Sequence, residues 1–367
     1  AVPYSRPDMY KFSKNKDIYS SKSVYPSESH TEVTTQYLNG YAFAFLNFTP
    51  LQYVPSTGKV MYAKNVKVVV NTISEREDHS SMLWNTSDNI KTVSKIAQDP
   101  EMMTSYASRE FVMTGYDMLV ITGEEYIEGY SEYVNYYDSI GVRTRIVGLE
   151  EIYSEMEGQD NQEKIRNYII REYQNEGIYM VTLGGDVNIV PYRGFYCIVN
   201  GDTEDYGIPA DMYYSCLDGT WNDNGNNKWG EPEESDMMPE IGISRMSFAN
   251  ADKQAVLIRK TLSYQRNPVL GEFHDVTLGS EIMDDTPTYG GDYLELIIGE
   301  RSDNGYTTIG IPEDYNFTRV YEEHGNWSGQ NLMVALNEGA QYLHHAGHAN
   351  SDFVAGWYNS DITDANF

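Results

Sequence analysis

Residues 117–122, Asp-Met-Leu-Val-Ile-Thr, form a continuous apolar run that ends at Gly123. Strands that are buried on both faces of a parallel sheet have this composition. Residues 124–139 then repeat apolar side chains at helical spacing and stop before Gly141, and residues 143–148 read as a second strand. This order of strand, helix and strand predicts a parallel sheet with right-handed crossovers.

The same alternation continues along the rest of the chain. A helix from Asp160 to Gly177 and a strand over residues 178–183, closed by Gly184, complete the first half. After a break at Arg266-Asn-Pro, strands are expected at residues 275–280, 317–321 and 340–344, and helices at 291–300 and 330–337. The sequence therefore predicts two α/β sub-domains, residues 111–270 and residues 271–367, with the second one incomplete at Phe367. Ligands of such sheets bind beyond the carboxyl ends of the strands.

The N-terminal part has a different pattern. Residues 31–73 alternate apolar and polar side chains, including a strand pattern at 64–70, and Pro55-Ser-Thr-Gly-Lys interrupts them as a hairpin turn would. A polar arm follows, with one short helix expected at residues 88–98. We assign residues 1–110 to an all-β domain, a small sandwich or sheet, and its connecting arm.

Charge excludes two classes of partner. The 367 residues hold 26 Lys and Arg against 55 Asp and Glu, which gives a net charge of −29. Such a surface repels phosphate backbones and anionic headgroups, so neither nucleic acid nor a membrane surface is an expected partner. No apolar run reaches the roughly 18 residues of a membrane span. The chain begins Ala-Val-Pro-Tyr without a signal peptide, so we expect a mature or trimmed form, and the 32 tyrosines fit a secreted protein with β-structure.

Histidines carry the clearest chemical signal. Four of the seven lie between residues 324 and 348, and three form the segment His344-His-Ala-Gly-His348. An apolar strand that ends in Gly-His presents an imidazole at the carboxyl edge of a sheet, where it can act as a base. We therefore favour a catalytic role for His348. A zinc site and structural histidines at a strand end are the alternatives.

Several motifs then reveal a family resemblance that covers nearly the whole chain. They are Tyr342-Leu-His-His-Ala-Gly-His348-Ala-Asn-Ser, Tyr116-Asp-Met-Leu-Val-Ile-Thr, Met180-Val-Thr-Leu-Gly-Gly-Asp-Val-Asn-Ile-Val-Pro191, Ile208-Pro-Ala-Asp211-Met-Tyr-Tyr, Pro239-Glu-Ile-Gly-Ile-Ser-Arg245, and, in the first domain, Thr49-Pro-Leu-Gln-Tyr-Val-Pro-Ser-Thr-Gly-Lys. In this order they resemble the gingipain-like cysteine peptidases, a group with a caspase-like fold. The resemblance implies a secreted endopeptidase zymogen with an N-terminal prodomain and a Cys–His mechanism that acts on protein or peptide substrates. His348 matches the histidine that assists the nucleophile.

The nucleophile itself is missing from the matching position. In the family it follows the histidine segment, on the next strand, whereas Cys197 and Cys216 both precede His348. A truncated sequence, a second chain that carries the cysteine, or a pseudoenzyme would each explain this. The rival interpretation is a non-catalytic secreted binding or scaffold protein that retains the fold.

Two further residues gain expected roles from the resemblance. Asp211 lies in a segment comparable to one that lines the pocket for a basic side chain, so a weak preference for Arg or Lys before the scissile bond is expected. Arg109 lies in the connecting arm, where cleavage would release the prodomain.

A last stretch is rich in oxygen ligands. Six residues supply them: Asp218, Asn222, Asp223, Asn224, Asn226 and Glu231. Oxygen donors on a turning backbone suit calcium, although the spacing is not that of an EF-hand. We expect a structural calcium ion here, with an ordinary Asn/Gly turn as the alternative.

Overall fold

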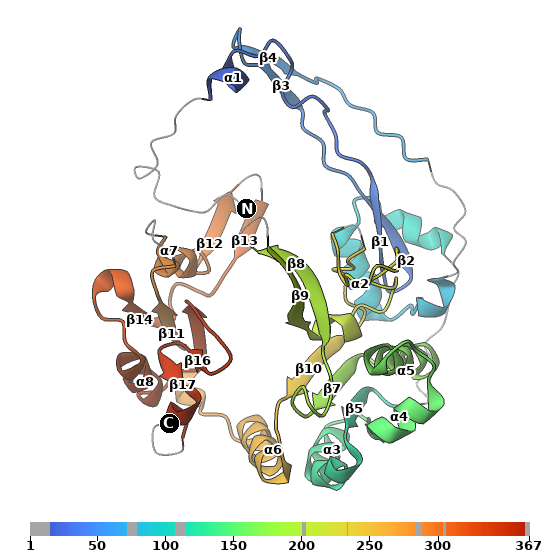
Figure 1. Ribbon diagram of the computed structural model, residues 1–367, viewed down its shortest axis with the longest axis vertical. Helices are drawn as coiled ribbons and strands as arrows, with labels where there is room; N and C mark the ends of the chain where they lie inside the picture. Colours follow the sequence, from blue (N-terminus) through green and yellow to red (C-terminus); the bar gives the residue numbers. More distant parts are fainter. Residues whose placement is uncertain are drawn as a thin grey trace. The chain divides into compact units, whose positions relative to one another are not determined.

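The computed structural model describes residues 15–71, 79–106, 115–199, 203–232, 234–283, 288–303 and 306–363. The chain divides into two compact units, one of Lys16–Arg266 and one that begins at Asn267. Figure 1 labels the helices and strands of both units.

A four-stranded parallel sheet forms the centre of the first unit. Its strand order is β10-β7-β5-β6, and its members are β5 (Met118–Thr122), β6 (Thr144–Gly148), β7 (Met180–Gly184) and β10 (Gly242–Met246). Every residue of β5 is buried, as the apolar run predicts. The predicted crossover order along the chain is confirmed.

Helices cover both faces of this sheet (Figure 1). Helices α3 (Ser131–Ser139) and α6 (Ala251–Arg266) pack on one face, around Tyr130, Tyr133 and Leu262. Helices α4 (Leu149–Glu155) and α5 (Asn161–Glu176) pack on the other face, where the largest apolar cluster of the described residues lies.

Helix α5 begins and ends where its sequence indicates. The Asp160 carboxylate accepts the backbone N–H of Glu163 at 2.8 Å, which caps the amino end. Gly177 ends the helix with a φ of 71°, a conformation that favours glycine. The predicted helix at residues 124–139 is shorter than expected, since two 3₁₀ turns precede α3.

A long hairpin leaves this sub-domain after β7. It consists of β8 (Arg193–Val199) and β9 (Thr203–Ala210), which pair antiparallel with an irregularity between Phe195 and Cys197. The sequence analysis did not predict this hairpin.

The N-terminal part is built from two separate hairpins. They are β1 (Thr34–Leu38) with β2 (Tyr41–Phe45), and β3 (Leu51–Val54) with β4 (Lys59–Tyr62); two helices, α1 (Lys16–Tyr19) and α2 (Ser87–Ile96), accompany them. The predicted turn at residues 55–59 and the helix expected at 88–98 are confirmed. The predicted strand at 64–70 is wrong: this segment pairs with no strand among the residues that the structure describes, and Val66, Val68 and Val70 are exposed.

The second unit contains a three-stranded parallel sheet in the order β14-β11-β15. The strands are β11 (Asp275–Ser280), β14 (Asn316–Tyr321) and β15 (Tyr342–Ala346), and the helices are α7 (Gly290–Glu295) and α8 (Gly329–Asn337). Two small hairpins, β12 (Glu300–Asp303) with β13 (Tyr306–Ile309) and β16 (Phe353–Val354) with β17 (Trp357–Tyr358), complete it. Helix α7 stops at Glu295, earlier than the predicted residue 300, because the chain turns there into β12.

The predicted fold class is therefore confirmed: an α/β protein of two parallel sheets with flanking helices, preceded by a part built mainly from β-hairpins. The predicted domain boundaries at residues 110 and 270 stay predictions. Within the described residues, no helix is both long and apolar enough to cross a bilayer.

Candidate functional site

His348 lies just beyond the carboxyl edge of the second sheet. Strand β15 ends at Ala346 opposite Ser280 of β11, so the residues that follow both strands meet at one edge. The side chain of His348 is exposed, and its backbone N–H donates to Glu281 Oε2 at 3.0 Å. The structure thus presents this imidazole where the sequence predicted it, with its main chain fixed by a carboxylate.

Glu281 connects the two strand ends, and the sequence analysis missed it. Its backbone N–H donates to the carbonyl of Ala346 at 2.9 Å, while its Oε1 lies 3.4 Å from Nε2 of His345. Both side chains are largely buried, at 12% and 13% exposure. A polar residue directly after an apolar strand was the available signal, since that position falls on the ligand edge of the sheet.

His345 is held from its other side by an indole ring. Trp327 stacks on the imidazole with a centroid distance of 5.4 Å and an interplanar angle of 11°. Burial lowers the pKa of His345, against the opposing effect of Glu281. The lowered pKa of His345 favours the neutral form of this imidazole.

Gly347 is required by close packing between these groups. A Cβ added to it would lie 2.8 Å from the carboxyl carbon of Glu281 and would collide with Nε2 of His345. A side chain here would force Glu281 away from the backbone of His348.

The three histidines of the segment diverge. His344 lies on the opposite face of β15 from His345, where its Nδ1 is 3.1 Å from the hydroxyl of Tyr342. It lines a cavity of about 380 Å³ together with Phe273, Val276, Ile297, Gly310, Ile311, Tyr315, Gln341 and Tyr342.

Among the residues that the structure describes, no three His, Cys, Asp or Glu side chains group as a metal site. The zinc alternative thus gains no support.

Further carboxylates gather at the edge that carries His348. Glu322 follows β14, and its Oε2 accepts the backbone N–H of Ile282 at 2.7 Å. Glu323 approaches Gly291 at the start of α7, whose first turn carries Asp292. The surroundings of Glu281 are therefore acidic.

Asp211, the predicted substrate-binding residue, forms an ion pair within the first unit. Its two carboxylate oxygens accept from Nε and Nη2 of Arg245, both at 2.7 Å. The same guanidinium donates to the carbonyls of Gly185 and Val190 at 3.0 and 2.7 Å. A bidentate ion pair thus binds Asp211 to Arg245, and a role of Asp211 in substrate binding stays a prediction.

Five of the six predicted calcium ligands accept hydrogen bonds from groups of their own loop. Side-chain oxygens of three asparagines accept N–H groups two to five residues onward: Asn222 from Asn227, Asn224 from Asn226, and Asn226 from Lys228. Asp223 accepts from Thr220, and Glu231 accepts the amides of Asn224 and Asn226. Asp218 is buried, whereas Asp223, Asn224 and Asn226 are exposed. This is the pattern of an Asn/Gly turn, and calcium binding stays a prediction.

Arg109, the predicted activation site, lies outside the described residues.

Both cysteines are free thiols. Cys216 is buried, which raises the pKa of its thiol, whereas Cys197 is half-buried on β8.

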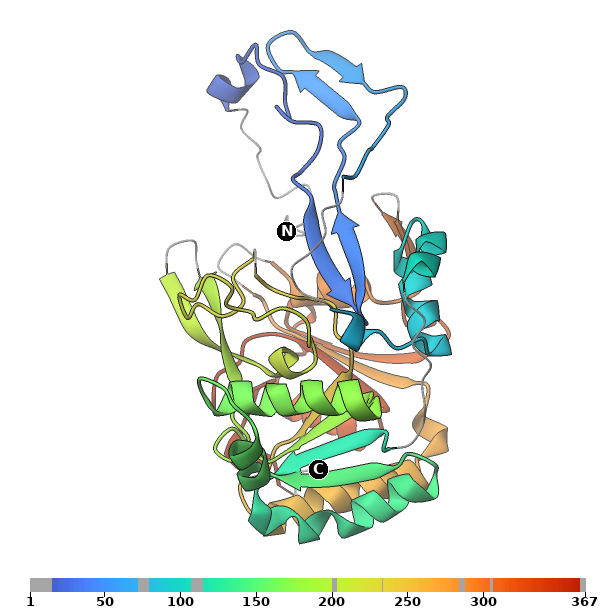
Figure 2. The same cartoon turned by 90° about the vertical axis from the view of Figure 1, so that its right-hand side faces the viewer.

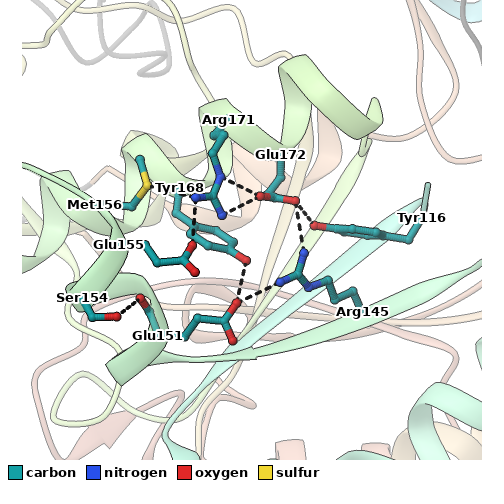
Figure 3. Close-up of polar contacts among 9 residues, drawn as sticks. All are labelled: Tyr116, Arg145, Glu151, Ser154, Glu155, Met156, Tyr168, Arg171 and Glu172. Carbon is teal, nitrogen blue, oxygen red and sulfur yellow. Dashed lines mark hydrogen bonds and ion pairs between the residues drawn. The ribbon is translucent and has the colours of Figure 1, made fainter. Parts of the chain in front are cut away.

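A second concentration of charge surrounds Glu172 of α5 (Figure 3). Its carboxylate accepts from the hydroxyl of Tyr116 and pairs with Arg171 at 2.9 Å and Arg145 at 3.6 Å. These groups join α5 to Tyr116, which precedes β5, and to Arg145 of β6. Since each carboxylate oxygen already has donors, we assign the network a structural role.

The fold and the edge around His348 define a class: an α/β protein of two parallel sheets with an exposed histidine at a carboxyl edge, preceded by an N-terminal part built mainly from hairpins. The chain belongs to peptidase family C25, whose profile matches residues 112–366, and the propeptide profile of the same family matches residues 2–98. The predicted resemblance is thereby confirmed.

Individual relatives are distant. Gingipain R2 of Porphyromonas gingivalis is 24% identical over 342 residues, which are 90% of this chain and 41% of that protein. Gingipain R1 of the same organism is 23% identical over 340 residues, with 30% of its length covered. The chain thus spans less than half of these relatives.

The solved structures that match this chain are similarly low in sequence identity. A crystal structure of the Arg specific cysteine proteinase gingipain R (RgpB) matches with a TM-score of 0.46 and 19% identity, over 70% of this chain and 52% of the other. A complex of the pro- and mature domains of RgpB matches with a TM-score of 0.44 and 18% identity, over 66% and 50%.

Proposed function

We propose that this chain is the zymogen part of a secreted endopeptidase that cleaves peptide bonds by a cysteine–histidine mechanism. The observation that carries the proposal is the exposed His348, fixed through its backbone by Glu281, in a chain of peptidase family C25. His348 would take the proton of a cysteine thiol and deliver it to the leaving amine, while the thiolate forms an acyl-enzyme that water then hydrolyses.

The nucleophile would come from a cysteine outside residues 1–367. Cys216 is a poor candidate because its buried thiol has a raised pKa, and thiolates form at sites of lowered pKa. Cys197 lies within a hairpin strand of the first unit. Neither follows the histidine segment, as the family pattern requires.

A basic residue before the scissile bond suits the acidic edge. Glu281, Glu322 and Glu323 follow the strands that end there, and Asp292 lies in the adjoining helix α7. A cationic side chain is attracted to such a cluster. This edge is a proposed source of the preference in addition to Asp211.

The test uses the product of the complete reading frame and matched peptide amides with Arg, Lys or Glu before the cleaved bond. We expect the Arg and Lys amides to be hydrolysed, a thiol alkylating reagent to stop the reaction, and His348→Ala to lower kcat/KM by roughly a thousandfold or more. His344→Ala is the matched control, because it removes a neighbouring imidazole from the other side of β15.

Full activity of His348→Ala, or insensitivity to alkylation, would exclude the mechanism. Complete lack of hydrolysis in the wild-type protein would favour the non-catalytic scaffold, which keeps the same fold.

A further inference from the structure

The indole of Trp327 contacts the second sheet where β11 and β15 lie side by side. This sheet belongs to the orange-to-red part of the chain (Figure 2). Gly279 of β11 and His345 of β15 are partners in the register of the two strands. The indole stacks on the His345 imidazole, with ring centroids 5.4 Å apart and an interplanar angle of 11°. A Cβ added to Gly279 would lie 3.1 Å from Cζ3 of the indole, so the ring packs tightly against both strands.

The backbone on both sides of Trp327 is fixed by hydrogen bonds. Oδ1 of Asn326 accepts the backbone N–H of Tyr321, the last residue of β14, at 2.8 Å. The hydroxyl of Ser328 accepts the backbone N–H of Asn331 at 3.0 Å and caps the amino end of α8. The indole is therefore carried by a segment that is bound to a strand and to a helix.

The imidazole of His345 faces a carboxylate at the end of the strands. Its Nε2 is buried and makes no hydrogen bond of standard geometry within the described part of the chain, and Oε1 of Glu281 lies 3.4 Å from it. A Cβ added to Gly347 would collide with this nitrogen and lie 2.8 Å from the carboxyl carbon of Glu281. Buried ring N–H groups are normally paired, and such contacts are often longer in a substrate-free site than in the catalytic complex. Glu281 is thus the acceptor within reach of His345.

Glu281 offers its two oxygens to two different histidines. Oε2 accepts the backbone N–H of His348 at 3.0 Å, while Oε1 faces Nε2 of His345. Because a carboxylate is a rigid planar group, the position of Oε1 determines the position of Oε2. The backbone of His348 is therefore linked to the imidazole of His345 through one side chain.

The surroundings of His345 favour its neutral form. Burial lowers the pKa of this imidazole, the carboxylate of Glu281 opposes that effect, and the neighbouring His344 and His348 lower the pKa further. Helix α8 contributes apolar side chains to this face of the sheet, among them Leu332. A neutral imidazole can donate from Nε2 without adding a positive charge beside Glu281.

We propose that Trp327 and His345 are positioning residues for His348. The indole orients the imidazole of His345, Nε2 of His345 donates to Glu281, and Glu281 holds the backbone of His348. Because this donor carries no charge, it fixes the carboxylate without neutralising it. The consequence for catalysis rests on the proposed function, whereas the arrangement of the side chains does not.

The first test measures the kinetics of His345 variants in the product of the complete reading frame. His345→Leu removes the donor but keeps an apolar side chain, so we expect kcat to fall by roughly 10- to 100-fold with KM unchanged. His345→Gln keeps a neutral N–H donor and should restore kcat to within about threefold of the wild type. His344→Ala, on the opposite face of β15, is the matched control. An unchanged kcat for His345→Leu, or equal losses for Leu and Gln, would overturn the proposal.

The second test replaces the indole of Trp327. Trp327→Phe keeps a ring that can stack and should preserve the pH–rate profile. Trp327→Leu admits water to the imidazole, which raises the pKa of His345, so His345 becomes charged at a higher pH and activity should be lost earlier on acidification. Melting temperatures show whether both variants fold. A loss of kcat in Trp327→Leu that is equal at all pH values would mean that Trp327 only supports the fold.

The third test needs no peptidase activity. In protein labelled with ¹⁵N-histidine, long-range ¹H–¹⁵N correlations should show His345 as the neutral Nε2–H tautomer at pH 7. The backbone amide of His348 should shift in His345→Leu but not in His344→Ala. A neutral Nδ1–H tautomer of His345, or an unchanged His348 amide in His345→Leu, would overturn the proposal. An inactive wild-type protein would contradict the proposed function alone, because the NMR result still decides the positioning role.

Discussion

At the scale of single residues, Glu281 is the side chain on which the candidate site depends most. It bonds the backbone of His348, approaches His345 and joins β11 to β15. Nothing in the local sequence pairs Glu281 with His348, because the two are 67 positions apart. Only the register of the parallel strands brings them together, and a single sequence does not give that register.

Replacement of Glu281 by Gln should lower activity without unfolding the protein. The amide keeps the shape and one acceptor but removes the charge beside the two histidines, so we expect kcat to fall by about 10- to 100-fold with little change in KM. The pH–rate profile should shift together with kcat, since Glu281 acts through the histidines. Glu338→Gln, at an exposed position after α8, is the matched control, and an unchanged profile for Glu281→Gln would show that Glu281 only supports the fold.

Asp236 makes stability depend on pH. Burial, with a contribution from Asp218, raises the pKa of Asp236 from 3.8 to about 7, and burial likewise raises the pKa of Glu240 to about 9. Between pH 4 and pH 7 the unfolded chain has lost a proton that the folded chain retains. The free energy of unfolding therefore falls as pH rises through this interval.

The Asp236→Asn variant should lose less stability than the wild-type chain between pH 5 and pH 8. Asparagine cannot ionise, yet it still accepts the N–H of Met238. We therefore expect the free energy of unfolding to fall by about 2 kcal/mol less in the variant than in the wild-type chain over this pH range. Urea unfolding at pH 5, 6, 7 and 8 measures it, with the exposed Asp223→Asn as control. Parallel curves for Asp236→Asn and wild type would refute this assignment.

At the scale of elements, sequence patterns predicted what local chemistry determines. The buried run of β5, the Asp160 cap and Gly177 stop of α5, and the turn between β3 and β4 were all predictable. The strand at 64–70 failed although its valines suit a strand, because a strand also needs a partner. The β8–β9 hairpin was missed for a related reason: its residues are partly exposed on both sides and show no clear alternation.

The amino end of α5 offers a direct test of such local chemistry. Asp160 both caps the helix and pairs with Arg193 at 2.8 Å. Asp160→Asn keeps the cap and loses the charge, whereas Asp160→Ala loses both. We expect urea unfolding to show a loss of about 1 kcal/mol for Asn and about 2–4 kcal/mol for Ala. Equal losses would mean that the cap contributes nothing.

The loop of residues 218–231 decides the calcium hypothesis. That hypothesis predicts a higher melting temperature with calcium than with EGTA at equal ionic strength, because an ion bound only to the folded state stabilises it. Asn224→Ala combined with Asn226→Ala should abolish the difference. Equal melting temperatures for the wild-type chain would contradict the hypothesis and leave the loop as a turn.

At the scale of the whole molecule, the order of motifs was more informative than any one of them. Each short motif allows more than one interpretation, as the zinc alternative for the histidines illustrates. The order of the motifs along the 367 residues nevertheless predicted the family that the profiles matched. The ion pair of Asp211 with Arg245 could not be predicted because the two residues are 34 positions apart. Part of the net charge of −29 is concentrated in the carboxylates around His348.

The central claim is that His348 takes the proton of a cysteine thiol other than Cys197 and Cys216. The most direct test treats the product of the complete reading frame with an arginyl acyloxymethyl ketone, which forms a thioether with an active-site cysteine, and maps the labelled residue by peptide mass spectrometry. We predict one label, on a cysteine outside residues 1–367, and loss of that label in His348→Ala. A label on Cys197 or Cys216, or labelling that persists without His348, would contradict the account.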